Sequence, residues 1–443
     1  AKSLNPIGFH RPYLGEPWPL PAAIAEIVKS DPLQQNTLGV LPSTPTINQH
    51  NVSFYGAQAD FRVFGRQVGT QAAMLDQDLR SLDWFLLKTG DQGSIPEAQS
   101  EMVELVRTSP EFAQHWQTAL PDGSELQLYH RRRPSVTVEP VSTEHSLRLE
   151  ILDLPTQARP GQPVPVTYRW LGPAETLANG LVLLDWRPIT ESGQTENSSP
   201  AWIHDHGFGM GYLRSQTLSS TNQSELATWR VIERTAMLPP PNLSGSFQLT
   251  ARYLDSQSGE THSIPVPANS LALSSDSPQS SAPELDLGTQ LRQLAPNMAE
   301  GDASLDRIFT EIGRINQYDP TQDYLRQLIQ TLQFRLRSQP NPDWLYAVTL
   351  AQVLRQDPLG AIATLTQLAE LSPENPFVYA YLSFLYLYNW QPRQAQDALL
   401  PAEQLAPELE IIQILGGASR LLQGNVIGAW KRLQPLLSPG SAN

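Results

Sequence analysis

Residues 376–409, PFVYAYLSFLYLYNWQPRQAQDALLPAEQLAPEL, contain the pattern that decides the fold of the C-terminal part of the chain. Several kinds of position in and around this stretch recur at a spacing of 34 residues. Their agreement favours a true repeat over an irregular α-helical bundle whose spacing coincides by chance. The recurring residues are the small residues Thr349, Ser383 and Gly417, the alanines Ala361, Ala395 and Ala429, the leucines Leu365, Leu399 and Leu433, and the prolines Pro373 and Pro407.

A 34-residue period with a small residue in the first helix, alanine opening the second and proline at the turn is typical of the tetratricopeptide repeat. Each repeat is a helical hairpin that cannot bury its apolar face alone, so neighbouring hairpins stack and leave a concave surface. We therefore predict a helical repeat domain over residues 301–443 that docks a partner protein. Most aromatic residues of the middle repeat are expected to pack between helices, and the candidates for partner contact are Tyr379, Tyr386, Tyr388 and Trp390.

The segment before the repeats changes in composition. Residues 274–283 are rich in Ser, Asp and Pro and poor in side chains that can pack, which predicts a linker over residues 276–300. Between 305 and 315, and again between 324 and 336, the apolar residues fall on one helical face. These two patterns predict two further amphipathic helices.

Residues 136–275 have the pattern of β-strands. Apolar and polar residues alternate in segments such as 146–151, 164–170 and 246–254, and clusters of Gly, Pro and Ser separate the segments. No helical stripe of useful length occurs in this region. We predict an antiparallel, immunoglobulin-like β-sandwich that has no disulfide, because the chain contains no cysteine.

Residues 1–135 alternate between apolar runs of strand length and helical patterns. This alternation predicts a small α/β domain with a mainly parallel sheet. We expect the strands near 37–41, 61–64, 82–87 and 126–129, and the helices near 21–28, 71–80 and 96–108.

Composition excludes several classes of function. The chain carries 44 acidic and 30 basic residues, a formal charge of -14, which argues against a nucleic-acid partner. The absence of cysteine excludes a thiolate nucleophile and a Cys-ligated zinc site. No stretch approaches the roughly 18 apolar residues that span a bilayer, and no signal-peptide pattern follows Ala1, so we expect a soluble or trimmed product.

The sequence contains no recognised catalytic signature. A phosphate loop, a dinucleotide fingerprint, a nucleophile elbow and a His-Glu-x-x-His motif are all absent, so we predict no catalytic residue and no cofactor.

One chemically rich stretch lies in the β region. In Trp202-Ile203-His204-Asp205-His206, two imidazoles and a carboxylate could bind a divalent metal. In a strand, however, residues i and i+2 share a face while i+1 points away, and no third ligand is evident from the spacing. A polar ligand or sugar could instead contact Trp202, His204, Asp205 and His206, or these residues could hold together a Gly-rich bend. We predict no metal site here, but all three interpretations stay open, with the structural bend first, the polar ligand second and the metal last.

A second polar stretch, residues 41–55, follows the first predicted strand. In an α/β sheet, the loop after the carboxyl end of a strand is a favoured place for a ligand. The amide and hydroxyl groups here suit sugar hydroxyls or phosphate, but they could equally cap backbone groups within an irregular loop. The candidate ligand residues are Ser43, Thr44, Asn48, His50 and Asn51.

Several motifs also resemble a known enzyme family. Residues 39–51 (GVLPSTPTINQHN), 65–69 (GRQVG), 83–90 (DWFLLKTG) and 120–124 (LPDGS) resemble the part that follows the membrane helices in cyanobacterial-type family 39 glycosyltransferases, the dolichyl-phosphate-mannose-type enzymes. The β region is similar to what comes next in those proteins, through residues 202–206 (WIHDH) and 229–234 (WRVIER). The resemblance covers roughly residues 1–270.

This resemblance implies an extracytoplasmic location, in the periplasm or on the thylakoid lumen side, and a link to sugar transfer from a polyprenyl-phosphate carrier. In that family the catalytic acidic residue sits in a loop between transmembrane helices, so no catalytic residue carries over to this chain. Our leading hypothesis is the extracytoplasmic portion of a membrane glycosyltransferase, tethered through an upstream membrane segment. It would cover the active site and bind acceptor or glycan, while its repeats dock a protein.

Two alternatives come from other classes of function. The first is a stand-alone periplasmic or luminal scaffold or assembly protein that handles no sugar. The second is a metal-dependent hydrolase centred on His204 and His206.

Overall fold

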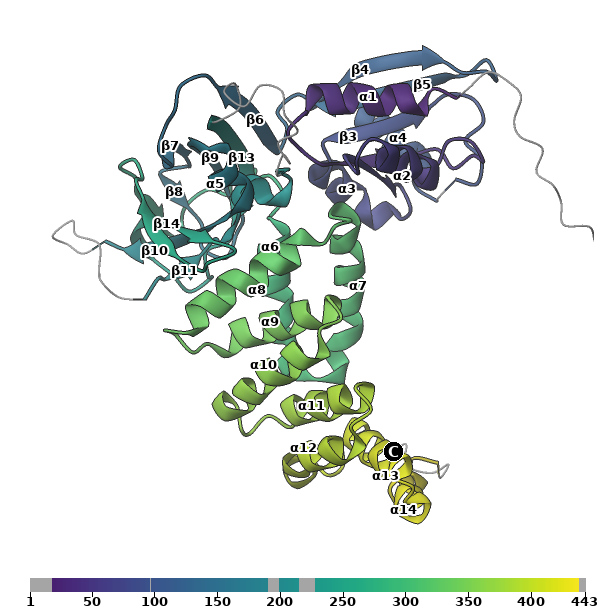
Figure 1. The fold of residues 1–443 in the computed structure, drawn as a ribbon, viewed down its shortest axis with the longest axis vertical. Coiled ribbons are helices and arrows are strands. Elements are labelled where there is room, and N and C mark those ends of the chain that lie inside the picture. The colour runs from purple at the N-terminus through teal and green to yellow at the C-terminus, as the bar shows by residue number, and fades with distance from the viewer. Residues whose placement is uncertain (1–17, 96, 190–198, 215–227, 438–443) are drawn as a thin grey trace, which may run out of the picture. The chain divides into compact units, whose positions relative to one another are not determined.

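The computed structural model describes residues 18–189, 199–214 and 228–437, apart from residue 96. Contacts divide the chain into two compact units, Ala1–Pro134 and Ser135–Asn443. The first unit mixes strands and helices, and the second begins with β-strands and continues with helices (Figure 1). Within the described ranges, no helix has both the length and the apolar character that crossing a membrane requires.

The first unit is built on a five-stranded sheet in the order β2-β1-β3-β5-β4. β1 (Asn36–Val40) pairs in parallel with β2 (Val63–Gln67) and β3 (Trp84–Lys88). β4 (Phe112–Ala119) and β5 (Glu125–Arg131) form an antiparallel hairpin that joins the sheet at β3. Residues 120–124 are too short a connection for a parallel crossover, so the predicted mainly parallel sheet is in fact mixed.

One helix of the first unit departs from the prediction. Residues 49–55, expected as part of a polar loop, belong to α2 (Gln49–Gln58). In this helix only Val52 and Gly56 are buried, so the sequence shows no apolar stripe. Position 56 requires glycine, because a Cβ there would lie only 1.8 Å from the Val63 carbonyl oxygen of β2. The other helical segments are α1 (Leu20–Ser30), η1 (Ala72–Met74), α3 (Leu75–Ser81) and α4 (Gln99–Thr108).

The β region of the second unit contains two sheets. One has the order β6-β13-β9-β7, and the other follows β11-β10-β14-β16-β8, with β12 on β10 and β15 on β14. Their pairings are antiparallel except for β16 with β8. The strands are β6 (Val136–Val141), β7 (Arg148–Asp153), β8 (Gln157–Ala158), β9 (Val164–Pro173), β10 (Gly180–Pro188), β11 (Trp202–Ile203), β12 (His206–Gly207), β13 (Thr228–Met237), β14 (Gly245–Asp255), β15 (Thr261–Ile264) and β16 (Leu271–Leu273), with α5 (Ala174–Asn179) and η2 (Phe208–Gly211) between them.

The predicted linker over residues 276–300 is wrong for its second half. Residues 287–300 form α6 (Leu287–Leu294) and η3 (Ala295–Glu300). The Asp286 carboxylate accepts a hydrogen bond from the Thr289 backbone N–H at 2.8 Å and caps α6. Leu291, Ala295 and Met298 are buried in the helical core. The polar composition of residues 274–283 hid this short apolar pattern.

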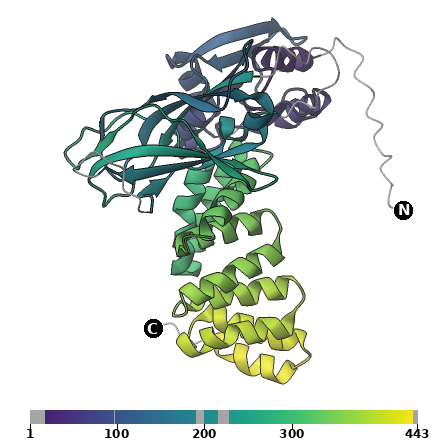
Figure 2. The ribbon, with the colours of Figure 1, turned by 60° about the vertical axis from the view of Figure 1, so that its left-hand side comes forward.

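The predicted helical repeat is confirmed. After α7 (Asp302–Tyr318) and α8 (Asp323–Leu336), three hairpins follow whose first helices begin at Pro342, Pro376 and Glu410, 34 residues apart. Figure 2 shows these hairpins stacked in chain order. The hairpin helices are α9 (Pro342–Leu354) with α10 (Pro358–Leu371), α11 (Pro376–Tyr388) with α12 (Pro392–Leu405), and α13 (Glu410–Leu422) with α14 (Val426–Leu437).

The small residues of the repeat let its helices approach closely. Ala361 and Ala395 are 0% exposed and Ala429 is 3% exposed. A Cβ added to Gly417 of α13 would lie 2.6 Å from Cγ of Leu433 in α14. The 34-residue spacing of small residues therefore reflects close packing of the two helices within each hairpin.

We predict that Gly417→Ala and Gly313→Ala change stability in opposite directions. Gly313 lies inside α7 with nothing within 4 Å of an added Cβ, so alanine should raise the free energy of unfolding by about 0.5–1 kcal/mol. At Gly417 the overlap with Leu433 should outweigh that gain and lower it by about 1 kcal/mol. Urea unfolding followed by far-UV circular dichroism measures both changes. Equal stabilisation by the two variants would contradict the close packing.

Candidate functional site

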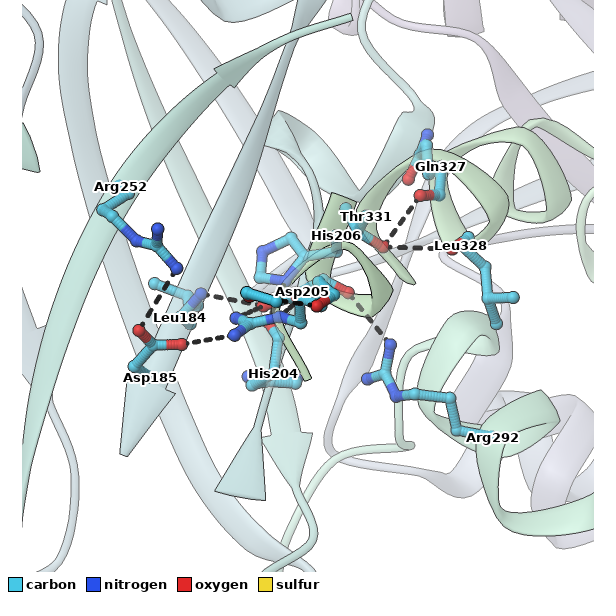
Figure 3. Close-up of polar contacts among 12 residues, drawn as sticks. Leu184, Asp185, His204, Asp205, His206, Arg252, Arg292, Gln327, Leu328 and Thr331 are labelled. Atoms are coloured by element: carbon cyan, nitrogen blue, oxygen red, sulfur yellow. Dashed lines mark hydrogen bonds and ion pairs between the residues drawn. The ribbon is translucent and has the colours of Figure 1, made fainter. Parts of the chain in front are cut away.

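The candidate residues 202–206 lie inside the second unit, between a sheet and the first helices. β11 and β12 pair with β10 on either side of a break at residues 204–205. His204, Asp205 and His206 are 1%, 2% and 4% exposed. Figure 3 shows them among side chains from β10, β14, α6 and α8. The stretch is therefore an internal site.

Asp205 is held by hydrogen bonds and ion pairs from β10, α6 and α8. Its Oδ1 accepts from the Leu184 backbone N–H at 2.9 Å and from Arg335 Nη2 at 2.6 Å, and its Oδ2 lies 2.5 Å from Arg335 Nε. Arg335 Nη1 lies 2.6 Å from Asp185 Oδ1, and Arg292 Nη1 donates to the Asp205 carbonyl oxygen at 3.2 Å. We call Asp185, Asp205, Arg292 and Arg335 the junction network, because it joins β10 and residue 205 to α6 and α8.

Arg335 and Asp185 of the junction network shift each other's pKa toward the charged forms. Burial alone would lower the pKa of Arg335, but the carboxylates of Asp205 and Asp185 raise it above its ordinary value. Burial alone would raise the pKa of Asp185, yet the charge of Arg335, together with Arg187 and Arg252, holds it below its ordinary value. A fixed ion pair of this kind joins structural elements.

The two histidines point away from Asp205, as their spacing predicted. His204 Nδ1 lies 2.9 Å from the Tyr168 hydroxyl, and its Nε2 lies 3.0 Å from Asp286 Oδ2. Burial lowers the pKa of His204 and outweighs the opposing effect of Asp286. A neutral imidazole fits both contacts, because Nε2–H can donate to the carboxylate while Nδ1 accepts from the hydroxyl.

His206 has the opposite character. Its Nδ1 lies 2.9 Å from the His204 carbonyl oxygen and its Nε2 lies 3.0 Å from Glu233 Oε2. Burial alone would lower the pKa of His206, but the charge of Glu233 raises it above its ordinary value. Both ring nitrogens face acceptors, so both donate and the ring is an imidazolium.

The Glu233 carboxylate accepts hydrogen bonds from three buried donors around the site. It is 0% exposed and accepts from Trp170 Nε1 at 2.7 Å and from the Gly209 backbone N–H at 2.6 Å, in addition to His206. Trp202, 6% exposed, stacks on Trp186 with ring centroids 5.1 Å apart. Within the described residues, no group of three or more His, Cys, Asp or Glu side chains could hold a metal ion. The contacts support the structural interpretation of this stretch.

The sequence analysis did not find the residues that pair with His204, Asp205 and His206. Two of these partners occupy sequence positions that could have indicated a buried ion pair. Arg335 falls on the same helical face as Leu328 and Leu332, and Glu233 shares a strand face with Val231. An ionisable residue in the middle of an apolar stripe needs a buried partner. The distance along the chain, 130 residues between Asp205 and Arg335, conceals which partner it is.

The polar stretch 41–55 forms its own internal contacts. Ser43 bridges Gly93 in parallel, and its backbone N–H donates to the Gln92 carbonyl oxygen at 2.9 Å. A Cβ on Gly93 would lie 2.2 Å from the Ser43 carbonyl oxygen. Residues 92–94 therefore pack directly against the chain beyond the carboxyl end of β1, the place where the sequence predicts a ligand.

The other candidate residues of this stretch lie just before helix α2 or in its first turn. Asn48 Oδ1 accepts from the His50 and Asn51 backbone N–H groups at 2.9 and 3.0 Å, and its Nδ2 donates to the Thr44 carbonyl oxygen at 2.8 Å. Thr44 Oγ1 in turn accepts from the Ile47 N–H at 2.9 Å. His50 is exposed and Asn51 is half-buried in the first turn. Capping of the helix accounts for Asn48 and loop closure for Thr44.

A pH-dependent carboxyl group lies elsewhere in this unit. Burial raises the pKa of Asp31 from 3.8 to about 6, although Trp84 Nε1, 2.9 Å from its Oδ2, opposes the shift. Because the folded state holds this proton more tightly, the free energy of unfolding falls as pH rises from about 4 to about 6.

We predict that Asp31→Asn removes this pH dependence and stabilises the first unit at pH 7 by about 1–2 kcal/mol, after allowance for partial exposure. Asparagine keeps an acceptor for Trp84 but has no charge to bury. Hydrogen exchange of the β1 and β3 amides in the full chain, at several pH values, measures the effect. A variant with the same pH slope as the wild type would show that Asp31 is not the responsible group.

The candidate partner-binding aromatics divide into two pairs. Tyr379 is half-buried and donates to the Pro373 carbonyl oxygen at 3.2 Å, and half-buried Tyr386 packs against the helical core. Tyr388 and Trp390 are 63% and 79% exposed. The second pair is therefore the more accessible at the surface.

No family model matches the chain, and no curated protein matches its sequence. Among solved structures, a crystal structure of MamA is similar at 16% identity and a TM-score of 0.26, covering 34% of this chain and 87% of that one. A structure of MamA MSR-1 is similar at 15% identity and a TM-score of 0.23, covering 33% and 92%. At such scores the similarity says nothing of what this chain binds. The helical repeat fold rests on the hairpins themselves.

Proposed function

We propose that this protein is a binding and scaffolding component that docks a short apolar segment of a partner protein on its last two helical hairpins. The distribution of exposed apolar side chains carries the proposal. Within the described ranges, thirteen of the eighteen large hydrophobic residues that are exposed lie between Leu359 and Trp430. Exposed apolar groups gathered in this way mark interaction surfaces.

The first helices of the last two hairpins present part of this surface at equivalent positions. Tyr388 of α11 and Leu422 of α13 are 34 residues apart and are 63% and 48% exposed. α11 packs beside α13, so the two side chains belong to neighbouring helices. Phe384, 53% exposed, lies one turn before Tyr388 on the same face of α11. We call Phe384, Tyr388 and Leu422 the docking stripe.

A segment of the protein itself covers the continuation of this face. The face of α11 that carries Phe384 and Tyr388 begins at Phe377 and Tyr381. There, the Tyr381 hydroxyl donates to the Met298 carbonyl oxygen of η3 at 2.8 Å. Gly301, just after η3, packs so closely on Phe377 that a Cβ would lie 2.2 Å from its ring. The face thus already holds one short helical segment, and a similar segment of a partner suits its exposed end.

Charge indicates a further property of the partner. Residues 358–409 contain one basic residue, Arg393, against five acidic ones. A partner segment that carries Lys or Arg beside its apolar residues complements this balance. The acidic residues are Glu370, Glu374, Asp397, Glu403 and Glu408.

The test is a photo-cross-linking amino acid at Phe384, followed by binding measurements with the purified partner it captures. Tyr388→Ser should weaken that binding by about tenfold or more, because a central aromatic contact is lost. The matched control is Leu359→Ser in α10, since Leu359 is 64% exposed but lies outside the docking stripe. Equal loss in both variants, or in neither, would refute the assignment of the stripe.

Replacement of Trp390 should affect partner binding and the free energy of unfolding in opposite directions. It has φ 56° in the turn between α11 and α12, where Gln356 has φ 58° one repeat earlier and Gly424 has φ 81° one repeat later. A bulky residue in this left-handed conformation is strained. We predict that Trp390→Gly weakens partner binding yet raises the free energy of unfolding by about 0.5–1 kcal/mol.

The control for Trp390 is Gln356→Gly, which relieves the same backbone strain one repeat away. It should stabilise the protein to a similar degree and leave partner binding unchanged. Urea unfolding and titration calorimetry report the two quantities separately. If Trp390→Gly bound the partner normally, the indole would have no part in docking.

The family resemblance supports a cellular setting for this function. We include in the proposal an extracytoplasmic location and an association with sugar transfer from a polyprenyl-phosphate carrier. The motifs at residues 39–51 and 202–206 support this setting. Reading the frame upstream of Ala1 tests it: a run of apolar helices supports a membrane glycosyltransferase, whereas a lone signal peptide supports a free scaffold.

The strand order also supports an immunoglobulin-like assignment of the β region. β7, β9 and β13 lie in one sheet, while β10, β14 and β15 lie in the other. β8, shortly after β7, crosses to the second sheet and pairs in parallel with β16. A chain segment that passes from the edge of one sheet to the edge of the other fits this sandwich type, in which binding surfaces occur on sheets and end loops.

A further inference from the structure

The last helix of the array, α14, presents an apolar face that its own hairpin does not cover. Val426, Ile427 and Trp430 are 62%, 73% and 58% exposed. Trp430 lies four residues after Val426 and three residues after Ile427, so the three side chains share one side of the helix. We call Val426, Ile427 and Trp430 the α14 face. A group of exposed apolar side chains of this kind indicates contact with another molecule.

The hairpin itself does not need this apolar face. α14 packs on α13 with the side that carries Leu433. In α12, one repeat earlier, Arg393 and Gln396 occupy the positions of Ile427 and Trp430. A polar face is therefore compatible with the repeat, and it is what the outer side of a terminal repeat usually has. The α14 face departs from that pattern.

Charge also distinguishes the last hairpin from those before it. Residues 410–437 contain one acidic residue and three basic residues, which are Arg420, Lys431 and Arg432. The two arginines pair with Glu403. Lys431 is exposed, and among the described residues it has no hydrogen-bond or ion-pair partner. Because Lys431 lies four positions after Ile427, its positive charge borders the α14 face.

The α14 face has the properties that the docking stripe requires of its occupant. The stripe suits a helical segment whose apolar side chains lie beside a basic residue, because residues 358–409 around it carry five acidic residues against one basic residue. α14 is a helix of 12 residues with three large apolar side chains at its surface and Lys431 next to them. One chain therefore contains both a docking surface and a segment that complements it.

Within one chain, the α14 face does not contact the docking stripe. Close packing of Leu433 against Gly417 holds α14 on α13, the helix that also carries Leu422 of the stripe. The α14 face lies on another side of the helix and remains exposed. A second copy can present the same face without any rearrangement of its hairpin.

We propose that the α14 face of one copy of this protein docks on the docking stripe of a second copy. This inference rests on the proposed function and names the partner of that surface. The contact has two different halves, one with Tyr388 and the other with Trp430, and each half can be removed separately.

Sedimentation velocity of the full chain, from about 1 to about 200 µM, should show association that grows with concentration, since a contact of this size is weak. Trp430→Ser and Tyr388→Ser should each raise the dissociation constant about tenfold or more, because each removes an aromatic side chain from one half. The matched control is Leu359→Ser, which should leave association unchanged. Leu359 is 64% exposed and corresponds to Ile427 two repeats earlier.

Mixing the two variants distinguishes this contact from other modes of self-association. Trp430→Ser keeps an intact docking stripe and Tyr388→Ser keeps an intact α14 face, so an equimolar mixture should form pairs that neither variant forms alone. A contact between two α14 helices predicts instead that Tyr388→Ser associates normally and that mixing restores nothing. That outcome, or a full chain that stays monomeric at the highest concentration, overturns the inference.

Failure of this inference and failure of the docking stripe give different results. If the chain stays monomeric but a purified partner loses binding in Tyr388→Ser, the stripe holds a different protein and only the second copy is excluded. If, in addition, no partner depends on Tyr388, the docking stripe itself is refuted. Both substitutions are at exposed positions, and far-UV circular dichroism verifies that the variants remain folded.

Discussion

Arg335→Met is expected to lower the free energy of unfolding of the second unit by about 3–5 kcal/mol, because it removes the arginine that pairs with the buried Asp205 carboxylate and one of the arginines that pair with Asp185. Arg335 is 5% exposed and pairs with Asp205 and Asp185, which are each 2% exposed. Methionine fills a similar volume, so the loss arises from charge rather than from a cavity. Urea unfolding monitored by tryptophan fluorescence measures the change.

The control for this prediction lies on the same helix. Arg326 of α8 pairs with Asp323 at 3.2 Å, but its side chain is 52% exposed. Arg326→Met should change the free energy of unfolding by no more than about 0.5 kcal/mol, since exposed ion pairs contribute little. If both variants unfolded at the same urea concentration, the junction network would not hold the sheet and helices together.

Glu233→Ala is the second change with a large expected effect, about 3–5 kcal/mol. The substitution removes the acceptor for Trp170 Nε1, the Gly209 N–H and the His206 ring, all inside the β region. His206 would then be a buried cation with no carboxylate hydrogen-bonded to it. Glu139→Ala provides the comparison, because Glu139 is 49% exposed and its ion pair with Arg230 should contribute little.

The charge of Glu233 can be tested separately by pH. Its carboxylate raises the pKa of His206 above the ordinary 6.5, so this contribution to stability is complete below pH 6.5 and is lost as pH rises through the higher value. Glu233→Gln lacks that contribution. We expect the difference in unfolding free energy between wild type and Glu233→Gln to shrink as pH rises above 6.5. A difference that did not vary with pH would mean that His206 is not protonated.

The helical repeat could be predicted because its signal is local and periodic. Close packing within a hairpin demands small side chains at fixed positions, and these recur in Ala361, Ala395 and Ala429. Helix α2 and residues 287–300 escaped prediction for the opposite reason. α2 buries only Val52 and Gly56, and the apolar pattern after Asp286 is short and follows a polar segment.

The site could be predicted only in part. The sequence showed that 202–206 is chemically unusual and that Asp205 turns away from His204 and His206 if the segment is extended. It did not show that Arg335, Asp286 and Glu233 complete the site, because these contacts form across long stretches of chain.

The two ends of the helical array differ in how they are held. At one end, Arg335 and Gln327 of α8 bond to Asp205 and to the Gly207 N–H, while at the other α14 exposes Ile427 and Trp430. In a stack where each hairpin touches only its neighbours, unfolding spreads from the part that is held by the fewest contacts. A tension applied at the C-terminus should therefore unravel the hairpins one by one toward α8, before the sheets yield. The array would act as an extensible tether whose root stays folded.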